Sequence, residues 1–275
     1  MQLGGAFKTL GAFNTIARLT TDERARGVIT CSSGNHGRAV ALAANRLGAL
    51  AVVVMPASAP HIKVDGVREV GGEVIFEETT SVERQLRAES EAAKRGLTMV
   101  PPFDHPWIIA GQATVGIEIL TDCPEVSDVL VPIGGDGLIA GVAAAIKRQK
   151  PAVRVIGVEP TGAATMKASI EGGQPATLDK THSIADGLRP VRPGDLTFAH
   201  VQAFVDELVA VGDEAIARAV VWLFQHAELV VEPSGAATVA AFHARAGRAH
   251  GVTVAVKSSG NMALDTFASL LKGQG

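Results

Sequence analysis

The chain has 275 residues and a formal net charge of −3, with 47% hydrophobic and 19% charged residues. This composition excludes an intrinsically disordered chain, and the charge gives no reason to expect a nucleic acid or an anionic membrane as a partner. The two cysteines are too few for a disulfide framework, and no apolar run approaches the ~20 residues of a membrane helix, so we expect a cytoplasmic protein. The length predicts one large domain or two modest domains.

Apolar runs of the kind found in buried strands alternate with helical patterns along the chain. In the first part, the expected elements are a strand at 27–31, a helix at 38–47, a strand at 50–55, a helix at 62–70, a strand at 73–76 and a helix at 81–95. Continuous apolar strands separated by helices are typical of βαβ units, and they predict an α/β fold with a parallel sheet covered on both faces.

The same alternation continues in the second part. The expected elements are strands at 128–133, 153–158, 205–211 and 252–256, with helices at 138–150, 162–171, 213–225 and 234–246. Residues 172–200 contain several glycines and prolines and little periodicity, which predicts a long loop.

Polar, glycine-bearing segments follow three of the predicted strands, at residues 32–37, 134–137 and 258–261. Open α/β sheets bind their ligands at the carboxyl ends of the strands. We therefore expect these three segments to face one cavity.

A fourth motif, Gly5-Ala6-Phe7-Lys8, places a lysine at the entrance of a helix. A lysine that reacts with a carbonyl must be held rigidly and lose its proton readily, and an apolar neighbour such as Phe7 favours both. Taken alone, Phe7-Lys8 is more typical of a surface lysine before a helix. The polar glycine segments elsewhere in the chain favour the functional interpretation.

The segment Ser32-Ser33-Gly34-Asn35-His36-Gly37 is the most specific string in the chain. Its glycines permit tight backbone geometry, and free amides at the start of the following helix favour a carboxylate. Asn35 can hydrogen-bond a ring hydroxyl. His36 is either a proton donor or a loop histidine without chemistry, and the sequence favours neither.

The segment Gly134-Gly135-Asp136-Gly137-Leu138 has the strand–glycine loop–helix pattern of a phosphate cradle. The alternatives are an ordinary turn or a dinucleotide site, but the spacing differs from G-x-G-x-x-G. A carboxylate of Asp136 aimed at a phosphate would cost roughly 1–4 kcal/mol, depending on the local dielectric.

These motifs, in this order, resemble the pyridoxal-phosphate enzymes of the threonine dehydratase and serine racemase family. Further strings strengthen the resemblance between residues 2 and 261, among them Ala185-Asp186-Gly187, Glu232-Pro233-Ser234-Gly235 and Lys257-Ser258-Ser259-Gly260-Asn261. The resemblance implies a tryptophan-synthase-β-like (type II) fold, in which a small domain at 30–103 is inserted in a large domain formed by 1–29 and 104–275. It also implies pyridoxal 5'-phosphate between the domains, an amino-acid substrate and a homodimer.

The resemblance assigns a role to each motif. Lys8 forms the Schiff base with the cofactor and then acts as the base at Cα, while Phe7 packs on the ring and Asn35 contacts its 3-hydroxyl. Ser258 contacts the pyridine nitrogen, and Ser33 matches the serine that acts on the opposite face of Cα in racemases. The phosphate is held by Gly134, Gly135, Asp136, Gly137 and Leu138, and the substrate carboxylate by Ser32, Ser33, Gly34, Asn35 and His36.

The chain also departs from the family. Asp136 and Ser259 replace glycines, Leu10 replaces an arginine, and the usual N-terminal stretch before the lysine is lacking. Several members bind a divalent cation, but only Glu159 and the Ala163 carbonyl match its ligands and Thr165 stands in place of the aspartate, which predicts weak binding at most.

The implied reaction is dehydration and deamination of L-threonine or L-serine to a 2-oxo acid and ammonia. An amino-acid racemase on the same scaffold and a degenerate, non-catalytic protein are the alternatives. A nucleotide-binding oxidoreductase would leave Lys8 and Asn35 unexplained.

Overall fold

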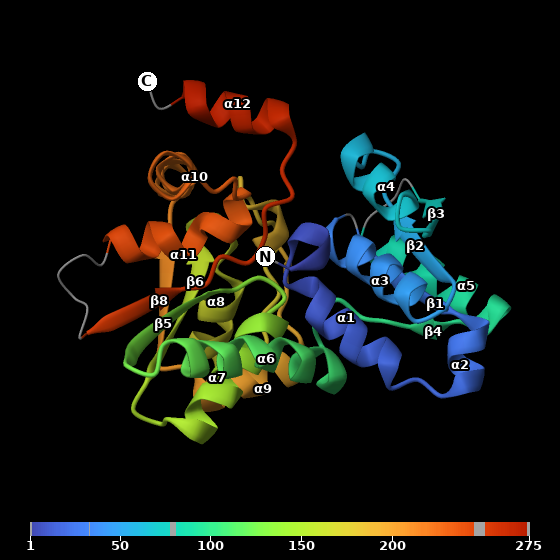
Figure 1. Ribbon diagram of the computed structural model, residues 1–275, viewed down its shortest axis with the longest axis horizontal. Helices are drawn as coiled ribbons and strands as arrows, with labels where there is room; N and C mark the ends of the chain where they lie inside the picture. Colours follow the sequence, from blue (N-terminus) through green and yellow to red (C-terminus); the bar gives the residue numbers. More distant parts are fainter. Residues whose placement is uncertain (1, 33, 78–80, 245–250, 274–275) are drawn as a thin grey trace. The chain divides into compact units, whose positions relative to one another are not determined.

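The structure is a computed structural model that describes residues 2–32, 34–77, 81–244 and 251–273 (Figure 1). The chain divides into two compact units, Met1–Gly111 and Gln112–Gly275, and each contains a four-stranded parallel sheet. The α/β prediction is confirmed. The proposed grouping of residues 1–29 with 104–275, around a small domain at 30–103, stays a prediction.

The first unit has a sheet of order β3-β2-β1-β4. Its strands are β1 (Val28–Cys31), β2 (Ala51–Met55), β3 (Glu73–Phe76) and β4 (Thr98–Met99). Its helices are α1 (Lys8–Ala17), α2 (Thr21–Arg26), α3 (Asn35–Arg46), α4 (His61–Arg68) and α5 (Ser81–Arg95), preceded by a 3₁₀ turn at Leu3–Gly5.

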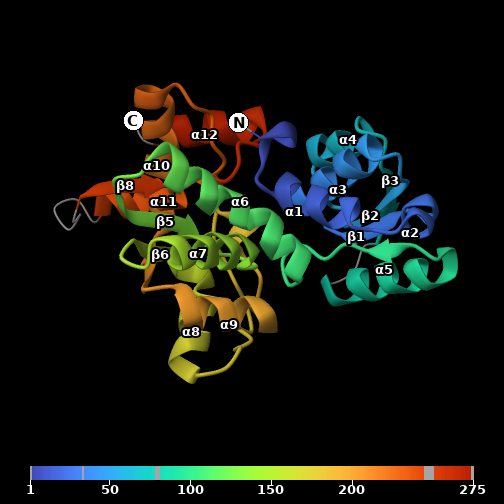
Figure 2. The same cartoon turned by 60° about the horizontal axis from the view of Figure 1, so that its bottom comes forward.

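Alternation of side chains along these strands buries both faces of the first sheet. Val28, Val53 and Met55 belong to one core with residues of α1 and α3. Val52 and Val54 belong to another core with Ala88 of α5. Figure 2 shows α3 and α5 on opposite sides of this sheet. The continuous apolar runs in the sequence predicted strands buried on both faces of a sheet, and these strands are buried on both faces.

The second unit has a sheet of order β7-β6-β5-β8. Its strands are β5 (Val126–Pro132), β6 (Arg154–Pro160), β7 (Glu207–Val211) and β8 (Val252–Ala255). The helix α6 (Pro106–Asp122) crosses the boundary between the units, and the other helices are α7 (Gly137–Gln149), α8 (Thr165–Gly172), α9 (Asp195–Phe204), α10 (Asp213–Ala227), α11 (Pro233–Ala244) and α12 (Leu264–Lys272). Short 3₁₀ turns lie at Thr161–Ala163 and Asp186–Leu188.

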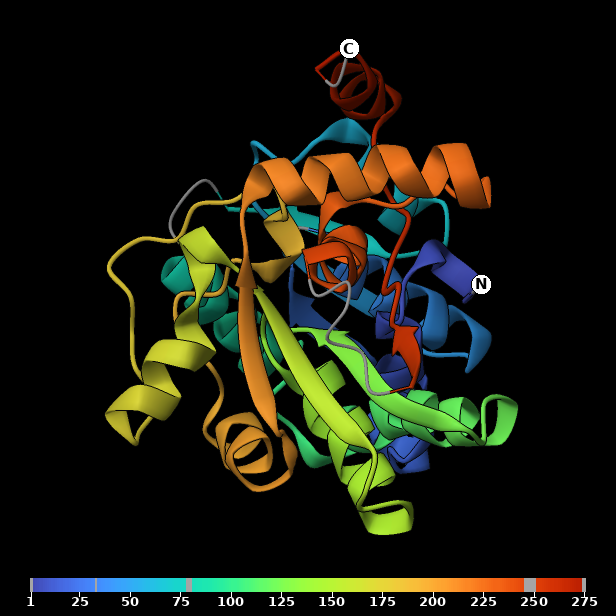
Figure 3. The ribbon, with the colours of Figure 1, turned by 90° about the vertical axis from the view of Figure 1, so that its left-hand side faces the viewer.

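Helices cover both faces of the second sheet as well (Figure 3). Leu130, Ile156 and Val158 pack with residues of α10 and α11. On the opposite face, a Cβ added at Gly157 would lie 3.0 Å from the Cδ1 atom of Ile139 in α7. A larger residue at 157 would push α7 away from the sheet.

The predicted strands and helices are present, with ends that differ from the prediction by a few residues. The predicted end of the helix at 234–246 lies outside the described residues. The prediction of a loop over 172–200 is wrong at its end, because α9 begins at Asp195. None of the helices in the described part of the chain has the length and hydropathy that crossing a bilayer requires.

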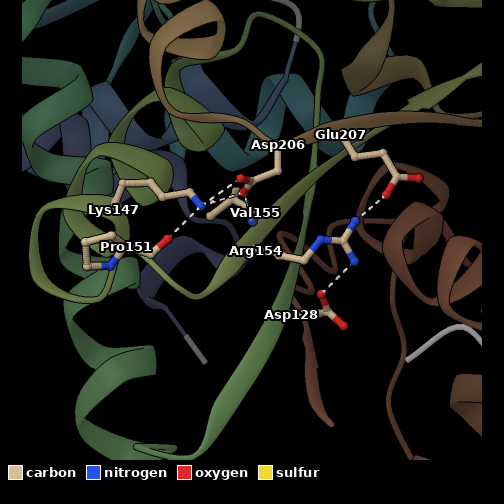
Figure 4. Close-up of polar contacts among 7 residues, drawn as sticks. All are labelled: Asp128, Lys147, Pro151, Arg154, Val155, Asp206 and Glu207. Carbon is tan, nitrogen blue, oxygen red and sulfur yellow. Dashed lines mark hydrogen bonds and ion pairs between the residues drawn. The ribbon is translucent and has the colours of Figure 1, made fainter. Parts of the chain in front are cut away.

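A group of ion pairs joins the amino ends of the strands in the second sheet (Figure 4). Arg154 lies between Asp128 and Glu207, at 3.3 and 2.8 Å. Lys147 contacts Asp206 at 2.8 Å, and the same carboxylate accepts the Val155 amide hydrogen at 2.7 Å. These charges hold β5, β6 and β7 together at the edge opposite to the glycine segments, so we assign them to stability rather than to the site.

Candidate active site

The predicted site residues are divided between the two units. Phe7, Lys8 and residues 32–37 belong to the first unit, whereas residues 134–138 and Ser258 belong to the second. Each group is described within its own unit.

Lys8 is the first residue of α1, with Phe7 at the N-cap. Its half-buried side chain donates a hydrogen bond from Nζ to the Pro102 carbonyl at 2.7 Å. The same nitrogen lies 5.1 Å from the centre of the Phe7 ring. The amine is therefore held at one place by a backbone acceptor and an aromatic face.

The helix that carries Lys8 is fixed at several points. A Cβ added at Gly111 would lie 2.6 Å from the Cα atom of Gly11, so α1 and α6 cross with their backbones in close contact. The Asn14 side-chain amide donates to the Trp107 carbonyl at 2.6 Å, and the Thr9 hydroxyl donates to the Leu3 carbonyl at 2.7 Å. This packing limits the movement of the amine at the start of the helix.

Residues 32–37 connect β1 to α3, as predicted. The helix begins at Asn35, earlier than the sequence suggested, so Asn35 and His36 lie in its first turn and Gly34 is its N-cap. A Cβ at Gly37 would lie 2.7 Å from the Cγ1 atom of Val53, which requires glycine where α3 meets β2. Ser33, predicted to act in catalysis and in carboxylate binding, lies outside the described residues.

His36 is a buried, neutral histidine. Its exposed fraction is 3%, and its Nε2 atom lies 3.0 Å from the Val100 carbonyl, to which it donates. Burial, and then the positive charge of Lys8, lower its pKa from 6.5 to about 3, against the opposing effect of the Val100 hydrogen bond. This environment favours a neutral ring over an imidazolium, and the two interpretations of His36 both stay predictions.

Lys8 and His36 are thus brought together in the first unit by one short segment after β4. The carbonyls of Val100 and Pro102 accept from His36 and from Lys8, respectively. These acceptors could not be predicted from the sequence, because every residue type has a backbone carbonyl.

In the second unit, residues 134–138 form the turn between β5 and α7. Asp136 is the N-cap residue with φ 70° and ψ −6°, a left-handed conformation that favours glycine. Its carbonyl accepts the first helical hydrogen bond, from the Ala140 amide at 2.9 Å. The amides of residues 137–139 precede any intrahelical acceptor and, with the helix dipole, suit a phosphate.

The Asp136 side chain is buried, with an exposed fraction of 3%. A buried carboxylate beside this turn opposes a second anion, whereas the backbone of the turn favours one. The residues therefore fit a phosphate through their amides, and the Asp136 carboxylate reduces that fit.

The other family-like strings of this unit pack around the same turn. A Cβ at Gly134 would lie 2.9 Å from the Gly187 carbonyl oxygen. The Gly187 amide donates to the Ser234 hydroxyl at 2.9 Å. A Cβ at Gly235 would lie 3.0 Å from the Ser259 amide nitrogen. Four segments far apart in the sequence are thus joined through contacts that leave no room for larger residues.

Ser258 and Ser259 are both buried at the end of the segment that follows β8. The Ser259 hydroxyl donates to the carboxylate of Glu232, which is also buried. Ser259 replaces a glycine of the family pattern, and its hydroxyl here ties the segment that carries Ser258 to the start of α11.

The residues predicted to bind a cation weakly have hydrogen-bond partners within the protein. Both oxygens of Glu159 accept backbone hydrogens of α8, from Met166 at 2.7 Å and from Lys167 at 2.9 Å. The Thr165 hydroxyl donates to the Ala163 carbonyl at 3.4 Å, and no group of three His, Cys, Asp or Glu side chains in the described ranges could hold a metal ion. Glu159 therefore caps the start of α8.

Comparison with known proteins gives the same picture as the motifs. The family described as "Pyridoxal-phosphate dependent enzyme" matches residues 1–260. An L-threonine ammonia-lyase of Thermotoga maritima is 45% identical over 241 residues, which cover 88% of this chain and 60% of the relative. The biosynthetic L-threonine dehydratase IlvA of Escherichia coli is 42% identical, over 86% of this chain and 46% of its own length. The chain thus spans about half of the length of these curated relatives.

Two solved structures are also similar over almost all of the chain. The processed form of threonine deaminase isoform 2 from Solanum lycopersicum has a TM-score of 0.95 at 38% identity, with 100% of this chain and 81% of that chain covered. Maize serine racemase has a TM-score of 0.93 at 37% identity, with coverages of 99% and 84%. The tryptophan-synthase-β-like fold predicted from the motifs is therefore confirmed.

Proposed function

The chain belongs to the family of pyridoxal-phosphate dependent enzymes, and we propose that it uses this cofactor to convert L-threonine or L-serine to a 2-oxo acid and ammonia. The observation that carries the proposal is Lys8, a half-buried amine held at the start of a helix beside a neutral histidine. A structural surface lysine would not need a half-buried backbone acceptor and an aromatic ring beside its amine.

Pyridoxal phosphate, when bound, withdraws electrons from the Cα atom of an amino acid and so makes its proton removable. Lys8 is the residue that we propose to hold its aldehyde end, with Phe7 and Asn35 beside the ring. The amides of residues 134–138 suit its phosphate, and Ser258 suits its pyridine nitrogen. Supporting this assignment are the left-handed turn at Asp136 and the buried position of Ser258.

The chain's own residues supply binding and proton transfer. The amides at the start of α3, with Ser32 and Ser33, take the substrate carboxylate. Lys8 Nζ removes the proton from Cα as general base. The β-hydroxyl leaves with a proton as water, and hydrolysis of the resulting enamine consumes that water and releases the 2-oxo acid and ammonia. His36 stays neutral throughout and keeps Lys8 free of a second cation.

Ser258 favours elimination over racemisation. A neutral serine leaves the pyridine nitrogen mostly unprotonated, whereas an aspartate would protonate it and strengthen electron withdrawal. Weaker withdrawal favours rapid loss of the β-substituent over a long-lived carbanion.

A racemase is the second candidate, favoured by the likeness to maize serine racemase. It would use Lys8 and Ser33 as bases on opposite faces of Cα. Chiral chromatography of the remaining amino acid separates the two candidates, because a lyase leaves no D-isomer. Ser33→Ala should then abolish racemisation and spare much of the lyase activity.

A degenerate protein without catalysis is the third candidate, and the buried Asp136 motivates it. Failure of the purified chain to bind pyridoxal phosphate, with binding restored in Asp136→Gly, would support that candidate.

The test of the proposal is turnover by the purified chain with added cofactor. We expect 2-oxobutanoate and ammonia in equal amounts from L-threonine, and pyruvate and ammonia from L-serine, with no product from Lys8→Ala. Sustained turnover by Lys8→Ala would overturn the role of Lys8.

We also propose a cytoplasmic homodimer. Cys31 and Cys123 are both free, as suits a reducing compartment. Light scattering should give twice the chain mass of 28.4 kDa, and a monomer across micromolar concentrations would contradict the assignment.

A further inference from the structure

Three consecutive residues connect His36 to Lys8 in the first unit. The buried His36 ring donates from Nε2 to the Val100 carbonyl at 3.0 Å, and Lys8 Nζ donates to the Pro102 carbonyl at 2.7 Å. The two accepting residues are separated in the chain by Pro101 alone. The histidine and the lysine therefore bind the two ends of one short stretch of backbone.

The first end of this stretch is fixed through both backbone groups of Val100. The Val100 amide donates to the Ile29 carbonyl of β1 at 2.9 Å, directly after the pairing of β4 with β1, and the Val100 carbonyl accepts from His36. Val100 has an exposed fraction of 0%. Loss of the His36 donor would leave a buried carbonyl without this hydrogen bond, which is costly and favours a shift of the backbone towards another donor.

Two prolines carry the position of Val100 to the residue that holds the lysine. A pyrrolidine ring fixes φ at about −65°, so residues 101 and 102 have little freedom of rotation. A residue that precedes a proline is restricted as well, which applies to Val100 and Pro101. A displacement of the Val100 carbonyl is therefore transmitted to the Pro102 carbonyl, because rotation between the two cannot absorb it.

The Pro102 carbonyl suits the proton transfer that we propose for Lys8. When Lys8 Nζ takes the proton from Cα it becomes an ammonium, and a carbonyl oxygen stabilises an ammonium through a charge-assisted hydrogen bond. The Phe7 ring, whose centre lies 5.1 Å from the same nitrogen, also favours the charged form. Burial, and then the charge of Lys8, lower the pKa of His36 from 6.5 to about 3, so its ring adds no positive charge beside this ammonium.

We propose that His36 is a positioning residue for Lys8, which acts through Val100 and the two prolines on the carbonyl that holds the Lys8 amine. The ring determines where Lys8 Nζ lies when it receives the proton, and it exchanges no proton itself. The effect on turnover rests on the proposed function, whereas the placement of the amine is a property of the chain without its cofactor.

Four variants separate positioning from stability. His36→Leu removes the donor to Val100, and His36→Gln keeps one. Pro101→Gly keeps the histidine and restores rotation between the two carbonyls, so the test does not depend on whether His36→Leu folds. Val67→Ala is the matched control, because it opens a cavity at a fully buried residue of α4 in the same unit and changes none of these contacts. Circular dichroism verifies the folding of each variant.

Trace acetylation of the full chain without cofactor, followed by mass spectrometry of the peptides, measures how firmly the amine is held. A half-buried amine that donates a hydrogen bond reacts more slowly than a released one. Lys8 should be acetylated about 3- to 10-fold faster in His36→Leu and Pro101→Gly than in the wild type, which is the effect of losing one hydrogen bond. His36→Gln and Val67→Ala should stay within about twofold of the wild type.

Lys147 is the internal control for this measurement, because its amine pairs with Asp206 in the second unit at 2.8 Å and its acetylation should be the same in every variant. Equal acetylation of Lys8 in the wild type and His36→Leu would overturn the inference, whether or not threonine is converted. An increase in His36→Leu that is absent from Pro101→Gly would refute the route through the prolines. An increase in His36→Gln as large as that in His36→Leu would show that the donor to Val100 is not the cause.

Steady-state kinetics of the holoenzyme with L-threonine give the second result. A displacement of about 1 Å at the reacting amine should lower kcat about 10- to 100-fold in His36→Leu and Pro101→Gly, with little change in KM. The deuterium isotope effect on kcat, measured with threonine deuterated at Cα, should increase, because the transfer of the proton to Lys8 becomes slower. His36→Gln should recover most of kcat, and Val67→Ala should match the wild type.

The two results distinguish the inference from the function on which it rests. A raised KM with unchanged kcat, or equal isotope effects in the wild type and His36→Leu, would contradict the positioning of the amine. A wild type that does not convert threonine would overturn the proposed function, and the acetylation of Lys8 would then decide the positioning by itself.

Discussion

Replacing His36 by glutamine should make the stability of the protein less sensitive to acid. The glutamine amide can take the place of the ring Nε2–H group and donate to the Val100 carbonyl, but it has no proton to gain. The comparison of His36→Gln with the wild type therefore isolates the titration of one buried side chain.

The direction follows from the pKa of His36, which is lowered from 6.5 to about 3 in the folded protein, first by burial and then by the positive charge of Lys8. Between these two values the unfolded chain binds a proton that the folded chain does not. Stability from this group is therefore fully present above pH 6.5 and is lost as the pH falls towards 3.

The magnitude follows from the same shift. At 1.36 kcal/mol for each pKa unit, a change from 6.5 to about 3 is worth about 5 kcal/mol once the pH is below both values. Of this, about 2 kcal/mol is lost between pH 7 and pH 5, and contributions from other groups that titrate in this range cancel in the comparison with His36→Gln. With an exposed fraction of 3%, the His36 ring is screened little by solvent.

Urea denaturation at pH 7, 6 and 5, followed by circular dichroism, measures the free energy of unfolding. The wild type should lose about 2 kcal/mol more than His36→Gln over this range. His36→Leu is the control, since it removes the titration and also leaves the Val100 carbonyl without a donor. Its free energy of unfolding should be about 1–3 kcal/mol lower than that of His36→Gln at pH 7, and the two values should change by the same amount as the pH falls. Parallel curves for the wild type and His36→Gln would refute the reasoning.

Two further substitutions test individual residues of the second unit. Asp136→Gly removes a buried carboxylate and a non-glycine residue with left-handed backbone. This variant should bind pyridoxal phosphate more tightly in an absorbance titration, and it should unfold at a higher temperature. Equal affinity in the variant and the wild type would show that the carboxylate does not oppose the phosphate. Glu159→Ala leaves the Met166 and Lys167 amides without their acceptor, and it should lower the free energy of unfolding, measured in urea, by about 1–3 kcal/mol. Adding Mg²⁺ or EDTA to the wild type should not change its melting temperature. A melting temperature that falls on adding EDTA would indicate a cation at Glu159 instead.

The strands were predictable because burial on both faces demands continuous apolar residues. Residues 73–76 and 81–95 were found with the predicted ends, since turn residues and a charged, amphipathic pattern mark them. The strand β4 has only two residues and exists through its pairing with β1, so no local pattern could indicate it. The helix α9 begins in a segment rich in proline and glycine, where the tertiary packing against α7 decides the conformation.

The site shows a similar division between local and tertiary information. Roles for the glycines, Lys8 and Asn35 could be proposed from the sequence because each belongs to a short motif of characteristic residue types. The neutral state of His36 depends on burial and on the charge of Lys8, neither of which a string contains.

The central claim is that the Lys8 amine carries the cofactor. Incubation with pyridoxal phosphate, reduction with borohydride and mass spectrometry of the peptides would test it most directly. We predict one pyridoxyl group per chain, on the peptide containing Lys8, and no label at that peptide when Lys8 is replaced by alanine. A stable label on another lysine in the wild type, with Lys8 unmodified, would contradict the claim.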